Sequence, residues 1–253
     1  MRVALGQIDT TDKREVLEKV EFLVRKNSAD IFVFPELLTT GYKEVAEKAE
    51  DINGESLRFL RELSRETGKA LVFSVALRRD DGIYNTAFFI LGDRMFYYDK
   101  AHLFKPLGEG EIFNPGRSLR LFEVEIGGDP FKFSLQICYD LRFPEAFRKL
   151  ALNGVKIIFI PAQWPLTRIG VWNSMLVSRA AENGIFIVGC NRVGEEKGIV
   201  YGGNSAVISP AGEVLVRLGE REGFAVVDVD LKEVERVRER INVLADVVDL
   251  DIE

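Results

Sequence analysis

Short apolar runs alternate with helical patterns along almost the whole chain, and this alternation limits the possible folds more than any other feature. Runs of four to eight apolar, β-branched or aromatic residues predict strands at 3–8, 31–34, 70–77, 86–91, 131–138, 157–160 and 185–190. Apolar stripes with helical spacing lie between them, at 16–24, 57–63, 144–153 and 172–180. Alternating strands and helices are typical of α/β proteins, so we expect an α/β fold.

A faint internal repeat indicates how the strands are divided. The sequence NTAFF at 85–89 is followed by Gly92-Asp93, and NSAVI at 204–208 is followed by Gly212-Glu213, so each segment predicts a strand, a turn and a strand. A twofold repeat of this kind would place two similar sheets face to face with helices outside them. No linker or low-complexity tract divides the chain, so residues 1–253 are expected to form one domain.

The last part of the chain, 231–253, reads as a tail. It begins with the charged run KEVERVRERI, which predicts a solvated helix, and continues with the apolar residues Val243, Leu244, Val247 and Val248. Exposed apolar residues of this kind are better covered by another subunit. We therefore expect the tail to lie at a subunit interface.

The charge and the cysteine content argue against several partners and locations. A net charge of −6 and the absence of any five-residue run of Lys and Arg argue against nucleic acid. No segment approaches the roughly 18 unbroken apolar residues that a membrane span requires. Cys138 and Cys190, the only two cysteines, form no disulfide framework, so we expect free thiols and a reducing, cytoplasmic location.

A single histidine, His102, limits the possible chemistry. It excludes a metal site built from several histidines, and any Cys-His hydrolase would have to use this residue. The phosphate-binding pattern G-x-x-x-x-G-K-[ST] is absent, and Gly108-Glu109-Gly110 lacks the third glycine of a dinucleotide-binding loop. We expect no metal and no cofactor.

Three loops that each follow an apolar run carry reactive side chains. Glu36 follows the run 31–34, Lys100 follows an aromatic run, and Cys138 ends the run 131–138 before a predicted helix start. Taken singly, each has a structural explanation: an edge carboxylate, a surface lysine, and a packing thiol like Cys190. Backbone N–H groups at a strand-to-helix junction can instead lower the pKa of a thiol and bind an oxyanion.

Together these three residues form a complete site for acyl transfer. A thiol can act as nucleophile, a carboxylate can take its proton, and an ammonium can stabilise the oxyanion, all without histidine. None of the structural explanations accounts for all three residues occurring together. The sequence therefore favours a cysteine hydrolase.

Three segments resemble the signature motifs of the nitrilase, or carbon–nitrogen hydrolase, superfamily. They are FPELLTTGY at 34–42, YDKAHLFKPLGEGEIFNPG at 98–116 and LQICYDLRFPE at 135–145, and they occur in the family's order. Further similarity extends through AQWP, RAAENG and CNRVG, so the resemblance covers nearly the whole chain. It implies an α-β-β-α sandwich that pairs into a dimer or a dimer-based oligomer and needs no metal or organic cofactor.

The resemblance also implies roles for individual residues. Glu36 matches the general base, Lys100 the lysine that stabilises the tetrahedral intermediate, and Cys138 the nucleophile. The backbone N–H of Tyr139 would complete the oxyanion site. Glu109 matches the family's second glutamate, which positions the substrate or supports the lysine, and it fits the family spacing better than Glu111.

Within the superfamily, CYDLRFPE, AQWP and RAAENG are similar to the ω-amidase branch, which hydrolyses the terminal amide of 2-oxoglutaramate and 2-oxosuccinamate. The α-carboxylate of such a substrate needs a cation, for which Arg168 is the first candidate and Arg142 the second. Arg142 could equally pair with a helix-end carboxylate. Tyr42, Tyr139 and Trp164 are candidate pocket walls, with core packing as the alternative.

Three other functions remain open at this point. The substrate could be an N-carbamoyl amino acid or a nitrile, both of which the superfamily accepts. The chain could also be a binding protein that has the fold without the activity.

Overall fold

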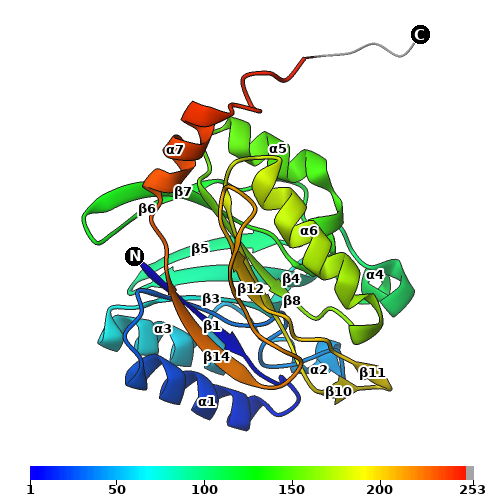
Figure 1. Ribbon diagram of the computed structural model, residues 1–253. Helices are drawn as coiled ribbons and strands as arrows, with labels where there is room; N and C mark the ends of the chain where they lie inside the picture. Colours follow the sequence, from blue (N-terminus) through cyan, green and yellow to red (C-terminus); the bar gives the residue numbers. More distant parts are fainter. Residues whose placement is uncertain (249–253) are drawn as a thin grey trace.

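Two six-stranded sheets stack face to face in the computed structural model, which describes residues 1–248 (Figure 1). In spatial order the first sheet contains β14 (Gly223–Asp228), β1 (Arg2–Gln7), β2 (Ile31–Val33), β3 (Ala70–Arg79), β4 (Gly82–Leu91) and β5 (Arg94–Asp99). The second contains β13 (Val214–Arg217), β12 (Ala206–Ile208), β9 (Phe186–Asn191), β8 (Ile157–Ala162), β7 (Asp129–Leu135) and β6 (Phe122–Ile126). Both sheets are mixed.

Helices cover the outer face of each sheet. The first sheet is covered by α1 (Lys13–Lys26) and α3 (Glu55–Thr67), and the second by α5 (Pro144–Leu152) and α6 (Ile169–Ala181) (Figure 1). The expected α/β fold with an α-β-β-α sandwich is therefore confirmed. The remaining elements are α2 (Val45–Lys48), α4 (Glu109–Ile112), α7 (Lys232–Arg240), η1 (Lys105–Leu107), η2 (Cys138–Arg142), η3 (Leu166–Arg168), β10 (Glu195–Glu196) and β11 (Ile199–Val200).

The central strands are apolar on both faces because both faces are buried. In β1, Val3 and Leu5 belong to the core between the sheets, whereas Ala4 belongs to the core under α1 and α3. The two sheets also meet through aromatic rings, with the centroids of Phe89 in β4 and Phe133 in β7 only 4.4 Å apart. Burying one such side chain contributes about 1.5–3 kcal/mol to folding.

The internal repeat in the sequence matches a repeat in topology. In the first sheet, β1, β2 and β3 are parallel and are followed by antiparallel β4 and β5. In the second sheet, β7, β8 and β9 are parallel and are followed by antiparallel β12 and β13. The two similar segments, 85–89 and 204–208, lie at or next to equivalent strands, β4 and β12.

One strand boundary differs from the prediction and matters for function. The strand predicted at 131–138 ends at Leu135, and Cys138 instead begins the 3-10 helix η2. Glu36 follows β2, so it lies at the carboxyl end of a parallel strand, where α/β sheets collect their functional groups.

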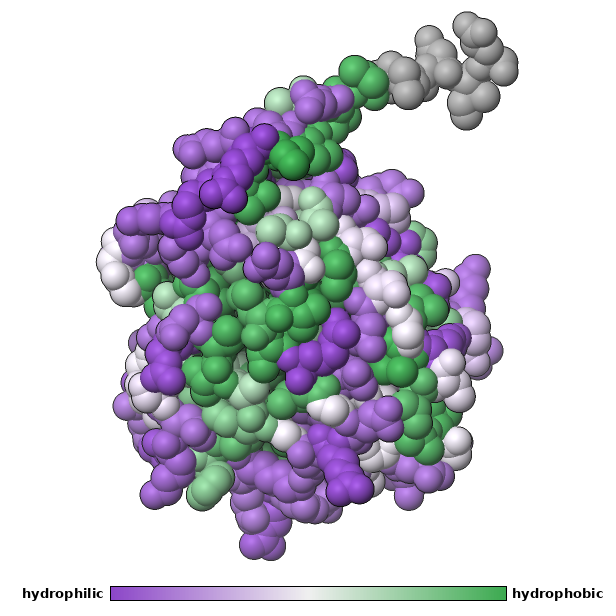
Figure 2. All heavy atoms as spheres, viewed as in Figure 1, coloured by the Kyte–Doolittle hydropathy of each residue, from purple (hydrophilic) through white to green (hydrophobic). Residues whose placement is uncertain are grey.

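The chain after α7 extends away from the two sheets (Figure 1). Ile241 (70%), Val243, Val247 and Val248 (68%) are exposed. Leu244 is instead half-buried and packs against the core, so the expectation that it is exposed is wrong. Figure 2 shows apolar residues on this projecting segment. Residues 249–253 of the tail predicted at 231–253 lie outside the described residues. Within residues 1–248, no helix is both long enough and apolar enough to cross a membrane.

Candidate active site

Glu36 is completely buried in a tight turn after β2. Its Oε1 accepts a hydrogen bond from Asn85 Nδ2 (2.7 Å), and its Oε2 accepts one from the backbone N–H of Gln163 (2.9 Å). The next residue, Leu37, has a φ of +45°, and its N–H donates to Ser74 Oγ at 2.8 Å. The carboxylate is thus fixed by β4, by the loop after β8 and by the shape of its own turn.

Lys100 joins two buried carboxylates. It follows β5, and its Nζ lies 2.8 Å from Glu36 Oε1 and 2.7 Å from Glu109 Oε1. Glu109 begins α4, and its Oε2 accepts the backbone N–H of Phe104 at 2.6 Å. The Tyr42 hydroxyl donates to Glu109 and also lies 3.3 Å from Glu36 Oε1. Every charged group of this cluster is therefore held by at least two neighbours.

Burial and the neighbouring charges shift the pKa values of Glu36 and Lys100. Burial raises the pKa of Glu36, and the positive charge of Lys100 only partly offsets this. Burial lowers the pKa of Lys100, but the negative charges of Glu109 and Glu36 outweigh it, so this pKa lies well above its usual value. Lys100 therefore carries its charge throughout the neutral range, and Glu36 is a stronger base than an exposed glutamate.

Cys138 occupies a strained turn. Its φ is +45°, in a region that L-residues rarely adopt and that costs about 1–3 kcal/mol. The carboxylate of Asp140 holds this turn, because its Oδ2 accepts both the backbone N–H of Ile137 (3.0 Å) and the Tyr98 hydroxyl (3.0 Å). Its Oδ1 accepts the backbone N–H of His102 at 3.0 Å and contacts His102 Nδ1 at 2.7 Å. The single histidine thus pairs with Asp140 and supports the turn.

The net pKa of the Cys138 thiol is raised rather than lowered, because the backbone N–H of Gln163 lowers it only slightly. Burial and the negative charge of Glu36 raise the pKa of this thiol well above its usual value, although Lys100 acts in the opposite direction. A hydrogen bond with the Cys138 thiol in turn lowers the pKa of Glu36. The thiol is therefore protonated at rest, and the group beside it that can take the proton is Glu36.

A pocket opens directly above Cys138. Its cavity volume is about 20 Å³, well below the roughly 300–1,000 Å³ typical of small-molecule sites. All five residues predicted as substrate contacts or pocket walls line it, and so do Glu109 and Cys138. Those five are Tyr42, Tyr139, Arg142, Trp164 and Arg168.

Two guanidinium groups at this pocket lie on aromatic rings. Arg142 is 5.1 Å from the centroid of Trp164 and 5.9 Å from that of Tyr139, and Arg168 is 5.0 Å from that of Phe104. Among residues 1–248, neither arginine forms a salt bridge. The helix-end carboxylate considered as a partner for Arg142 is therefore not seen, and both cations are available to an anionic ligand.

Sequence reasoning missed several supporting residues. Gln163 donates its backbone N–H to Glu36 Oε2 and its side-chain amide to Glu36 O (2.7 Å). Asn85 and Asp140 make the contacts described above. The sequence indicated the importance of these residues only through their positions. Gln163 lies in the AQWP motif, Asn85 in the internal repeat and Asp140 in CYDLRFPE. Glu111, the second candidate for the additional glutamate, is exposed.

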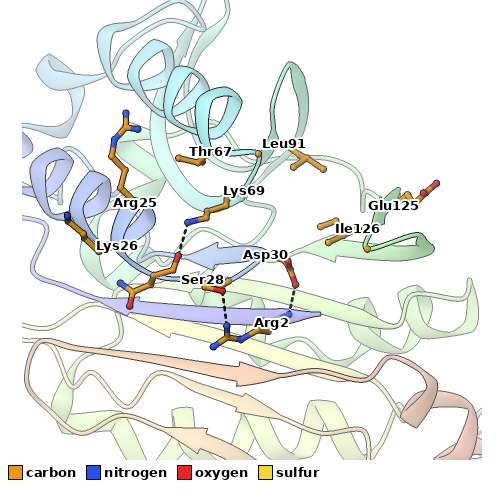
Figure 3. Close-up of a pocket in the computed structure, with 14 residues that line it drawn as sticks. Arg2, Arg25, Lys26, Ser28, Asp30, Thr67, Lys69, Leu91, Glu125 and Ile126 are labelled. Atoms are coloured by element: carbon orange, nitrogen blue, oxygen red, sulfur yellow. Dashed lines mark hydrogen bonds between the residues drawn. The ribbon is translucent and has the colours of Figure 1, made fainter.

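Another surface hollow lies at the opposite end of the first sheet, where β1, β2 and β3 begin (Figure 3). Lys69 lines it, and its ammonium donates to the carbonyls of Val24 (2.5 Å) and Asn27 (2.7 Å) at the end of α1. No cysteine is among the described residues that line this hollow. Within residues 1–248, no group of three or more His, Cys, Asp or Glu residues could hold a metal ion.

The fold and the site together define a class of hydrolase. The family model for carbon-nitrogen hydrolases matches residues 2–239, and the chain therefore belongs to the carbon–nitrogen hydrolase family, as the sequence motifs predicted.

The most informative relatives are amidases. The chain is 38% identical over 240 residues to the 2-oxoglutaramate amidase of Bacillus subtilis, covering 92% of this chain and 91% of that protein. It is 35% identical over 187 residues to the omega-amidase YafV of Yersinia enterocolitica, covering 73% of this chain and 71% of that protein.

Solved structures support the same assignment. The CN-hydrolase superfamily protein XC1258 from Xanthomonas campestris, with an arsenic adduct in its active site, superposes with a TM-score of 0.90 at 29% identity, covering 100% of this chain and 99% of that one. The amidase of Nesterenkonia sp. AN1, seen as a cysteine-to-alanine mutant in complex with butyramide, gives 0.82 at 28% identity, covering 96% and 95%.

Proposed function

We propose that this protein is a cysteine-dependent amidase that hydrolyses the terminal amide of a small carboxylate-bearing substrate such as 2-oxoglutaramate. The proposal rests on one observation above all. A buried cluster of Glu36, Lys100 and Cys138 meets a small pocket with two arginines that have no carboxylate partner among residues 1–248. The 2-oxoglutaramate amidase and omega-amidase among the relatives support the same substrate.

The first half of the reaction forms a thioester. Glu36 takes the proton of Cys138, and the sulfur attacks the amide carbon while the carbonyl π electrons move to oxygen. Lys100 has three N–H donors, two of which bond Glu36 and Glu109, so the third is available to the oxyanion. The N–H of Tyr139, the second residue of η2, has no acceptor within that helix and supplies the other donor.

The second half of the reaction releases the acid. As the tetrahedral intermediate collapses, protonated Glu36 gives its proton to the nitrogen and ammonia leaves. Glu36, again a carboxylate, takes a proton from water, and the resulting hydroxide attacks the thioester carbon. The carbon–sulfur bond then breaks, and the proton returns to the thiolate. In this scheme Glu109 keeps Lys100 in place rather than transferring protons.

The pocket explains why the substrate should carry a negative charge. Arg142 and Arg168 lie on aromatic rings and line the pocket that contains Cys138. A carboxylate that enters this pocket with its amide at Cys138 can accept hydrogen bonds from a planar guanidinium, which binds carboxylates in a bidentate fashion. Nitriles and simple amides lack this group, whereas N-carbamoyl amino acids have it and remain the second candidate.

A substrate panel tests this proposal. We expect 2-oxoglutaramate to release ammonia with a higher kcat/KM than butyramide, because only the former carries a carboxylate. Replacing Arg142 or Arg168 with Met keeps the apolar stem but removes a charged hydrogen bond worth about 1.5–3 kcal/mol. Where that arginine binds the carboxylate, kcat/KM for 2-oxoglutaramate should fall about 10- to 150-fold, with that for butyramide nearly unchanged.

Arg120→Met is the matched control for these variants. Its guanidinium also lies on an aromatic ring, 5.1 Å from the centroid of Tyr97, but it does not line the pocket. Equal activity on butyramide and 2-oxoglutaramate would contradict the proposed substrate class. No hydrolysis of amides, N-carbamoyl amino acids or nitriles would leave the binding protein as the better explanation.

The pH dependence of kcat/KM tests the role of Glu36. As a base, this residue must be deprotonated, so activity should fall as the pH drops through its pKa. Because burial raises that pKa, the acidic limb should have its midpoint above the ordinary value of 4.5. Initial rates between pH 4 and 8, with folding followed by circular dichroism, would measure it. A midpoint at or below 4.5 in folded protein would contradict this role.

We also propose that the protein is a cytoplasmic homodimer, or an oligomer of such dimers, and that residues 1–253 act as one domain whose tail contributes to the interface. Figure 2 shows an apolar patch on the face below α7, and Ile241, Val247 and Val248 in the tail are exposed as well. Apolar surface of this extent favours a partner subunit. A solution mass of one chain would exclude this assembly.

A further inference from the structure

A buried ion pair lies behind the pocket. Arg192, which follows β9, is completely buried, and Glu196 in the small hairpin of β10 and β11 is only 7% exposed. The Arg192 Nη1 and Glu196 Oε2 atoms are 2.8 Å apart. A buried pair of this kind is a weak source of stability, because removing both charges from water costs about as much as their attraction returns. Its contacts therefore point to another use.

Glu196 holds the turn that carries Tyr42. Its Oε2 accepts the backbone N–H of Tyr42 at 3.0 Å, and its Oε1 accepts that of Lys43 at 2.8 Å. The fit is close, because a Cβ at Gly41 would lie 2.8 Å from Glu196 Oε1, and Gly41 also has a φ of +56°. From this turn the Tyr42 hydroxyl donates to Glu109 and lies 3.3 Å from Glu36 Oε1, so its position depends on Glu196.

Arg192 is also connected to Glu36 through the side chain and backbone of Gln163. Its Nη1 also donates to Gln163 Oε1 at 2.8 Å. With that oxygen engaged, the side-chain NH₂ of Gln163 faces the carbonyl of Glu36 and donates to it at 2.7 Å. The backbone N–H of Gln163 donates to the Glu36 carboxylate itself at 2.9 Å. Arg192 thus fixes the amide that encloses Glu36 on one side.

Arg192 is itself firmly anchored. Its Nη2 donates to Asp9 Oδ1 and Thr11 Oγ1, both at 3.0 Å, and its guanidinium lies 4.4 Å from the ring centroid of Tyr201. The loop after β1, the loop after β8 and the Tyr42 turn are therefore connected through one guanidinium and its partner carboxylate. Neither residue lines the pocket.

We propose that Arg192 and Glu196 are positioning residues of the reaction, which hold the Tyr42 hydroxyl and the Glu36 carboxylate in register with Cys138. This inference rests on the proposed function, since it concerns the base of that reaction. Displacing a reacting group by about 1 Å can cost about 10²-fold in rate. The pair would therefore act on kcat without contacting the substrate.

Glu196→Gln is the central test. The amide keeps the size of the side chain but offers one acceptor oxygen where the carboxylate offers two, so it cannot bind Tyr42, Lys43 and Arg192 together. We expect kcat on 2-oxoglutaramate to fall about 10²-fold, with KM changed less than about threefold and the acidic limb of kcat/KM displaced. Glu196→Asp, which keeps the charge, should recover part of the loss.

A double-mutant cycle tests whether the loss of kcat in Glu196→Gln is transmitted through Tyr42. If Glu196 acts through Tyr42, combining Glu196→Gln with Tyr42→Phe should cost much less than the sum of the two single losses. Additive losses would overturn this part of the proposal. If Glu196→Gln is insoluble, Arg192→Lys provides a second comparison. A lysine has a single nitrogen, so it cannot keep both the Nη1 contacts with Glu196 and Gln163 and the Nη2 contacts with Asp9 and Thr11.

Glu50→Gln is the matched structural control. Glu50 also pairs with a cation, Lys13 at 2.6 Å, and also accepts a backbone N–H, that of Ser56 at 2.8 Å, but it does not contact the cluster. We expect this variant to lower Tm while kcat and the pH profile stay unchanged. If Glu196→Gln behaves in the same way, with a lower Tm and an unchanged kcat and pH profile, the pair is only structural and the proposal is overturned.

Alkylation separates this inference from the proposed function. The rate at which iodoacetamide modifies Cys138, followed by mass spectrometry across pH, reports on the base beside the thiol and needs no substrate. We expect Glu196→Gln to change that profile and Glu50→Gln to leave it unchanged. A wild-type protein that hydrolyses no amide would refute the proposed function, whereas an unchanged alkylation profile in Glu196→Gln would refute the role of the ion pair.

Discussion

Cys138→Ala is expected to lower kcat on 2-oxoglutaramate by about 10⁴-fold or more, because no thioester can form without the sulfur. Alanine retains the Cβ, so the strained φ of +45° at this position is unchanged and the turn held by Asp140 should persist. Ammonia release measures the rate. Mass spectrometry of the wild-type protein quenched during turnover should detect the acyl adduct on the peptide that contains Cys138.

Cys190→Ala is the matched control for that variant. Cys190 is completely buried in β9, and burial raises the pKa of its thiol to about 12. Its thiol donates to Gly6 O at 3.6 Å and accepts from Ser205 Oγ at 3.9 Å. We expect some loss of stability and an unchanged kcat. Retained activity in Cys138→Ala, or an acyl adduct on Cys190, would contradict the assigned nucleophile.

The layers of the fold were predictable because burial leaves a periodic signal. Strands such as β1 are apolar on both faces, and the stripes of α1 and α3 have helical spacing, so both can be read locally. The end of β7 could not be read in this way. The apolar run continues to Cys138, but the Asp140 carboxylate binds the N–H of Ile137 and turns the chain, and a carboxylate acting on the backbone leaves no periodic trace.

The candidate site was predictable where residues sit beside apolar runs. Apolar runs lead to Glu36, Lys100 and Cys138. In the structure Cys138 lines the pocket, and Glu36 and Lys100 are buried next to it. Arg192 and Gln163 were missed because their contacts join distant segments, as in the 127 positions between Gln163 and Glu36. The direction of the pKa shift of Cys138 was missed for the same reason, since it depends on burial and on a carboxylate from another loop.

Lys100→Met is the second variant with a large expected effect, and it should affect both rate and stability. Removing one oxyanion donor typically costs about 10²–10³ in kcat. The buried carboxylates of Glu36 and Glu109 also lose their counterion, and breaking a buried pair in this way costs about 3–5 kcal/mol. Denaturant unfolding and ammonia release would measure the two effects. Lys69→Met is the control, because that ammonium bonds only backbone carbonyls and its loss leaves no charge unpaired.

The two effects of Lys100→Met can be separated by a second substitution and by pH. Adding Glu109→Gln removes one of the unpaired charges, so it should restore part of the stability but none of the activity. The stability deficit of Lys100→Met should also shrink as the pH falls. Without the ammonium, the folded-state pKa of Glu36 lies further above its unfolded value, so the cost of burying this carboxylate is present at neutral pH and disappears as the group is protonated. If Glu109→Gln restored activity together with stability, Lys100 would be a structural counterion, and the oxyanion would have to be held by the backbone alone.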